Sequence, residues 1–81
     1  MAKTLNEMIV AYGVAKSAFR VARLQKMNQD IAIWASMYAD AIEDLRALGF
    51  EFSEDLEVIR FLGNAARRDY EQEQEVENAA S

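Results

Sequence analysis

The chain has 81 residues, a formal net charge of −5 and a hydrophobic share of 52%, which is too apolar for a disordered chain. It has no cysteine and no histidine, which excludes disulfides, the usual zinc sites and the standard histidine-dependent nucleophiles. Proline is also absent and there are only three glycines, so the composition predicts one all-α domain over residues 1–81, built from a few long helices.

A first helix is predicted over residues 4–27, because Thr4 and Glu7 have the spacing of a capping box. Its main feature is a ladder of alanines at spacings of four, three and four, which places them on one helical face. Small side chains allow close helix packing, and small domains gain core by association, so we predict a homodimer that forms through this ladder. The predicted self-association seam consists of Ala11, Ala15, Ala18, Ala22, Val14 and Phe19.

Lys16, Arg20 and Arg23 form a basic line on another face of this helix. Residues 1–29 carry five basic side chains and one acid, for +4, whereas residues 30–81 carry four and thirteen, for −9. The simplest interpretation of the line is a solvated face. The alternatives are pairing with an acidic protein segment and binding of nucleic-acid phosphates, and the acidic balance of the chain disfavours the second.

A break is predicted at residues 26–30, where Asn28 can close one helix and Asp30 can cap the next. Without glycine or proline here, an uninterrupted helix over residues 5–48 remains an alternative, and its length would require oligomerisation. With the break, the second helix covers residues 30–48. It has a clean amphipathic pattern, and Gly49 follows it where a left-handed residue is expected.

The aromatic residues around the second helix have two interpretations. Trp34 and Tyr38, one turn apart, are most simply core residues. In the alternative, they and the loop residues Phe50 and Phe52 form an anchor for a partner protein, because large aromatic side chains dominate many interfaces. With the basic line, these four residues complete the set of candidate partner-binding residues.

A third helix is predicted over residues 53–74, starting at Ser53 and keeping one apolar phase across Gly63. The first two helices and this one are expected to form an antiparallel bundle, or a helical hairpin with a third helix beside it. The segment 71–81 is rich in glutamate and is expected to fray. In an alternative, this acidic tail lies against the basic line.

Carboxylates at helical spacing raise the remote alternative of a Mg²⁺-dependent all-α hydrolase. They are expected on solvent-facing sides, so no catalytic, cofactor-binding or metal-binding residue is predicted. These residues are Asp40, Glu43, Asp44, Glu54 and Glu57. The N-terminal residues lack the pattern of a signal peptide, and no apolar run approaches the length of a membrane span, so the default expectation is a cytoplasmic protein.

Together these features predict a small non-enzymatic module that binds another protein, as a regulator or inhibitor of a larger assembly. Small, acidic, cysteine-free helical proteins of this kind are common among phage and plasmid products, an analogy that rests on size and composition. The alternative function is a nucleic-acid-binding transcriptional regulator that uses the basic line.

Overall fold

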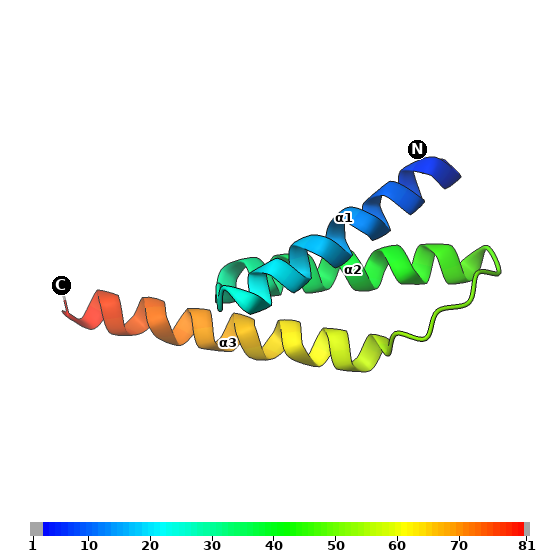
Figure 1. The fold of residues 1–81 in the computed structure, drawn as a ribbon. Helices are drawn as coiled ribbons and strands as arrows, with labels where there is room; N and C mark the ends of the chain where they lie inside the picture. The colour runs from blue at the N-terminus through cyan, green and yellow to red at the C-terminus, as the bar shows by residue number, and fades with distance from the viewer. Residues whose placement is uncertain (1–2, 81) are drawn as a thin grey trace.

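The computed structural model describes residues 3–80, and side chains as far as Glu77. Three helices make up most of this range: α1 (Leu5–Leu24), α2 (Asn28–Ala47) and α3 (Leu56–Ala80) (Figure 1). Residues 3–80 contain no strand, so the prediction of an all-α protein is confirmed for this range. None of the three helices is both long enough and apolar enough to cross a membrane.

The helix α2 lies at the centre of the molecule (Figure 1). Both α1 and α3 pack along it, whereas in the described range the backbones of α1 and α3 do not approach each other. The result is an elongated shape of 49 × 26 × 20 Å. A closed three-helix bundle would give every helix two neighbours, so this arrangement corresponds to the other predicted form, a hairpin with a third helix beside it.

The core is built from small residues of α1 and α2 around a few larger ones. Ala15 and Ala22 are buried, and Phe19 lies between them in the same core. Half of the predicted seam is therefore used inside the monomer, where α1 packs on α2. Of the other seam residues, Ala11 and Ala18 are half-buried and Val14 is exposed. The prediction of a homodimer itself stays a prediction. The buried alanines of α2 are Ala35, Ala39 and Ala41.

The contact between α2 and α3 is closest at Gly63. A Cβ atom built on this residue would lie 2.6 Å from the Cβ atom of Ala35, well inside van der Waals contact. Glycine therefore lets α3 lie close to α2 at this point, without a break in the helix.

The predicted break between the first two helices is confirmed, and the uninterrupted helix over residues 5–48 is wrong. Lys26, with φ of 55°, adopts the left-handed conformation that the sequence indicated for Asn28, which is instead the first residue of α2. The capping interaction at the start of α1 is present, since the Thr4 side chain accepts a hydrogen bond of 3.2 Å from the backbone N–H of Glu7. Gly49 has the expected positive φ, 98°.

Both ends of the third helix differ from the prediction. The cap is Asp55 and not Ser53, because the Asp55 carboxylate accepts from the backbone N–H groups of Glu57 and Val58, at 2.9 and 3.4 Å. The helix α3 continues past the predicted end at residue 74 to Ala80, and it projects beyond the turn between α1 and α2 (Figure 1). The fraying expected from residue 71 stays a prediction. Ser81 lies outside the described residues.

The first turns of the acidic tail are held by α2. The Asn28 side chain donates a hydrogen bond of 2.8 Å to the Glu73 carboxylate. The tail thus continues the axis of α3, and the alternative in which it lies against the basic line of its own chain does not hold in this structure.

Candidate protein-binding groove

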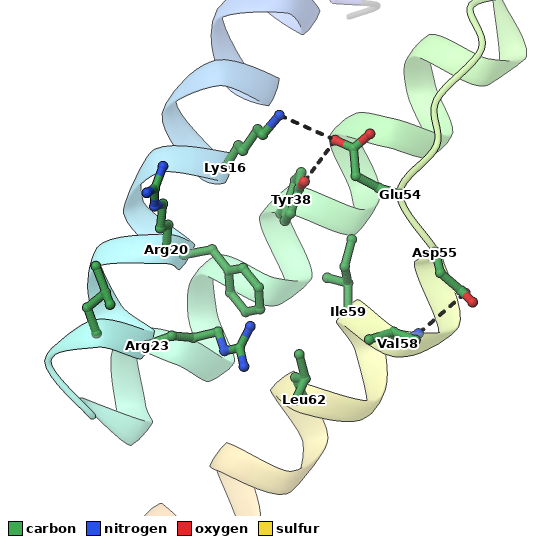
Figure 2. Close-up of a pocket in the computed structure, with 11 residues that line it drawn as sticks. Lys16, Arg20, Arg23, Tyr38, Glu54, Asp55, Val58, Ile59 and Leu62 are labelled. Carbon is green, nitrogen blue, oxygen red and sulfur yellow. Dashed lines mark hydrogen bonds and ion pairs between the residues drawn. The ribbon is translucent and has the colours of Figure 1, made fainter.

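A groove of about 590 Å³ lies between α1 and α3, with α2 at its floor (Figure 2). It exists because both outer helices attach to α2 without meeting, so the side chains that face each other across the gap have no partner helix. The lining residues from α1 run from Lys16 to Leu24, which corresponds to about 12 Å, or just over two helical turns. The other apolar lining residues are Phe19, Tyr38, Val58, Ile59 and Leu62.

The groove has a buried floor and an exposed apolar rim. Phe19, Tyr38 and Ile59 are buried and belong to the core. Leu24 and Val58, in contrast, are more than half exposed on opposite sides of the opening. An apolar surface of this shape loses water when an apolar side chain enters it, which favours binding.

The two edges of the groove carry opposite charges (Figure 2). Lys16, Arg20 and Arg23 lie along the α1 edge, and Glu54 and Asp55 lie on the opposite side near the start of α3. The Arg23 guanidinium lies 5.8 Å from the ring centre of Phe19, so part of this cation is over the apolar floor. Among the side chains described, neither Arg20 nor Arg23 forms an ion pair.

Glu54 closes the end of the groove through a polar cluster that joins α1, α2 and the loop before α3. Tyr38 donates a hydrogen bond of 2.8 Å to one Glu54 oxygen, and Tyr12 donates a second to the same oxygen. The Lys16 ammonium lies 3.8 Å from it. The Glu54 side chain is only 21% exposed, so the prediction that it faces solvent is wrong. The cluster attaches the loop before α3 to α1 and α2.

The same contacts set the charge of each group. The hydrogen bond from Tyr12 is the main cause that lowers the pKa of Glu54, against the opposing effect of burial. Burial is the main cause that raises the pKa of both Tyr12 and Tyr38, and their hydrogen bonds to Glu54 raise it further. Near neutral pH the carboxylate is therefore charged and both phenols keep their protons. This arrangement holds the loop before α3 in place.

These pKa shifts predict loss of stability at both ends of the pH range. Because the pKa of Glu54 is lowered in the folded state, its contribution is complete above the unfolded value of about 4.5 and is lost as the pH falls through the folded pKa. The tyrosine pKa values are raised, so their contribution is complete below about pH 10 and is lost as the pH rises through the folded values. We expect Glu54→Gln to lower the free energy of unfolding at pH 7 by about 1 to 3 kcal/mol.

The measurement is urea unfolding followed by circular dichroism at a series of pH values. Glu54→Gln should also reduce the loss of free energy of unfolding at acid pH, since the Glu54 carboxylate is no longer there to take up a proton. Glu51→Gln removes a charge from an exposed position in the same loop and is the matched control. The prediction would be contradicted if the free energy of unfolding fell equally steeply at acid pH in wild type and in Glu54→Gln.

The structure separates the predicted partner-binding residues into two groups. Lys16, Arg20, Arg23 and Tyr38 all line the groove. The loop aromatics do not join them, because the Phe52 ring packs on Tyr12 at 4.9 Å. Trp34 packs against the core, as its simpler interpretation expects, and Phe50 is exposed.

Sequence reasoning missed the α3 wall of the groove. Val58 and Leu62, spaced four apart, lie to one side of the core line that contains Ile59 and Ala66. The width of this apolar face could have predicted that α3 has a second apolar surface beside its core line. It could not have predicted which helix that surface faces.

Four of the five acidic residues considered for Mg²⁺ are engaged in ion pairs. Arg60 lies 2.7 Å from a Glu43 oxygen and 3.5 Å from Asp40, and Lys3 lies 3.4 Å from Asp44. Within the described part of the chain, no group of three or more acidic residues is arranged to hold a metal ion.

Comparison of this chain with protein-family models, with curated protein sequences and with solved structures finds no match in any of the three. The functional argument therefore rests on the groove and its chemistry.

Proposed function

We propose that this protein is a small, non-enzymatic regulator that binds one amphipathic α-helix of a partner protein in the groove between α1 and α3. The observation that supports the proposal is an open apolar groove with a buried floor, bordered by two arginines that form no ion pair with any described side chain. Its length fits the usual spacing of helix anchors, at positions i, i+3 or i+4, and i+7, over two turns.

The charges at the edges define the chemistry of the partner helix. Its apolar face enters the groove, and acidic side chains flank that face on the side of Arg20 and Arg23, where each arginine can bind a carboxylate. Asp55 on the opposite edge disfavours a second acidic flank there. Binding of this kind regulates the partner by covering the helix.

Nucleic-acid binding is supported less well by the same geometry. Lys16 is paired with Glu54, which leaves Arg20 and Arg23 as the cations of the groove edge. The carboxylates across the opening would repel phosphates, and the apolar floor has no use in binding a phosphate backbone.

The experiment uses a labelled synthetic helix with leucines on one face and glutamates along one flank of that face. Binding is measured by fluorescence anisotropy at low and moderate salt. We expect Leu62→Glu to weaken binding by about 10-fold or more, because it places a charge in the apolar groove. Val14→Glu, on a different exposed face, is the matched control and should leave the affinity unchanged.

A charge reversal tests the arginine edge. Arg20→Glu with Arg23→Glu should bind the glutamate-flanked peptide more weakly and a lysine-flanked version of it more tightly. If neither peptide binds in a way that depends on Leu62, the proposal fails. If the wild type instead binds duplex DNA with an affinity that depends on Arg20 and Arg23, the alternative function replaces it.

A further inference from the structure

The hairpin of α1 and α2 has a second apolar face, separate from the groove. It consists of five residues with aliphatic side chains, each of which is between 48% and 62% exposed. These residues are Val10, Val14, Val21, Ile33 and Met37. None of them lines the groove or belongs to the core cluster.

The two parts of this face lie on adjacent flanks of the two helices. Val10, Val14 and Val21 follow one another at spacings of four and seven on α1, so they share one line. Ile33 and Met37 share a line on α2 with Asp44, seven residues further on. The ion pair of 3.4 Å between Asp44 and Lys3, just before α1, places the start of α1 beside this line of α2.

The groove residues of α1 occupy a different line. Lys16 and Arg23, spaced seven apart, border the groove and face α3 across it. Since α3 packs only on α2 in the described range, no helix of the chain covers the valine side of α1. We call the set Val10, Val14, Val21, Ile33 and Met37 the hairpin face.

The total accessible surface is larger than that of a compact protein of the same mass. The chain exposes 5925 Å², whereas a compact monomer of 9.2 kDa exposes about 4,900 Å². The excess of about 1,000 Å² exceeds the ~800 Å² that each partner contributes to a standard interface. Part of the excess comes from the projecting end of α3, which is mainly polar. The apolar contribution from α1 and α2 includes the hairpin face.

We propose that the hairpin face binds a second copy of this chain in a two-fold symmetric dimer. A two-fold axis places the same patch against itself, which suits a surface whose central residues are aliphatic and uncharged. The one ion pair at its border, Lys3 with Asp44, is already satisfied within the chain, so no charge requires an oppositely charged partner. The dimer replaces the predicted alanine seam, since Ala15 and Ala22 are buried inside the monomer.

This dimer leaves the groove open in both copies, so it does not depend on the proposed function. Its test is the molar mass in solution, measured by light scattering after gel filtration over a range of protein concentrations. We expect wild type at twice 9.2 kDa. Val14→Glu should raise the dissociation constant by about 100-fold or more, because each dimer then buries two unpaired carboxylates.

Two further measurements test whether Val14→Glu acts on the dimer contact and not on folding. Circular dichroism should show unchanged helicity in Val14→Glu, since Val14 is exposed in the monomer. Mixing Val14→Glu/Met37→Glu with Val14→Lys/Met37→Lys should restore a dimer that neither variant forms alone, because the opposite charges then face each other. Val58→Glu, in the groove, should remain a dimer.

A wild type that stays monomeric at all concentrations would overturn the dimer, as would a dimer that Val14→Glu leaves intact. Failure of the groove proposal has a different signature. It would appear as loss of Leu62-dependent peptide binding, with the molar mass unchanged.

Discussion

Ile42→Ala is expected to lower the free energy of unfolding by about 2 to 5 kcal/mol. Ile42 is completely buried, and it is the largest side chain with this degree of burial. It belongs to a core cluster that includes Phe19 from α1 and Ile59 from α3. Its removal leaves a cavity among residues of all three helices, and a domain of this size has little stability to lose.

The measurement for Ile42→Ala is urea unfolding monitored by circular dichroism. Ile9→Ala removes the same atoms from a half-exposed position on α1 and is the matched control. We expect its effect to stay below about 1 kcal/mol, because about half of the residue is already in water and alanine favours the helix. Equal losses in the two variants would show that Ile42 is not at the centre of the core.

Two glycine-to-alanine substitutions are expected to change stability in opposite directions. At Gly13 a new Cβ atom meets nothing within 4 Å, so Gly13→Ala should stabilise the protein by up to about 1 kcal/mol through helix propensity. At Gly63 the new atom would lie 2.6 Å from the Cβ atom of Ala35. The helices must then separate, and we expect Gly63→Ala to destabilise the protein by about 1 to 3 kcal/mol in spite of the same propensity gain.

A double-mutant cycle tests the cause. Ala35→Gly removes the atom that a Cβ at Gly63 would meet, so Gly63→Ala should cost much less in that background than in wild type. The free energies come from urea unfolding of the four proteins. Additive effects would mean that the loss at Gly63 has another origin than this contact.

The local features that the sequence predicted correctly depend on short-range chemistry. The cap formed by Thr4 and the left-handed Gly49 each involve residues a few positions apart, so their pattern is visible in the chain itself. Where two local candidates competed, the prediction failed. Asp55 caps α3 although Ser53 fits the same rule, because only one of them meets the free N–H groups of the first turn.

The groove shows the limit of the same reasoning. Lys16, Arg20 and Arg23 were identified from their helical spacing, and the structure places all three on its edge. The place of Glu54 at the end of the groove was not predicted, because its partners Tyr12 and Tyr38 lie 42 and 16 residues away in the sequence. Spacing within one helix cannot show which side chains of different helices meet.

The sequence by itself determined that the chain is helical and that it has more apolar surface than one helix contact needs, because periodicity and capping act within a few turns. It left the turn between the first two helices as one of two alternatives. The tertiary structure alone decided where that surface lies. Ala15 and Ala22 of α1, which were predicted to join two copies, are buried inside the monomer instead, where α1 packs on α2. Gly63 lets α3 pack closely against α2. With α2 between them, α1 and α3 stay apart, and the groove and the hairpin face remain open.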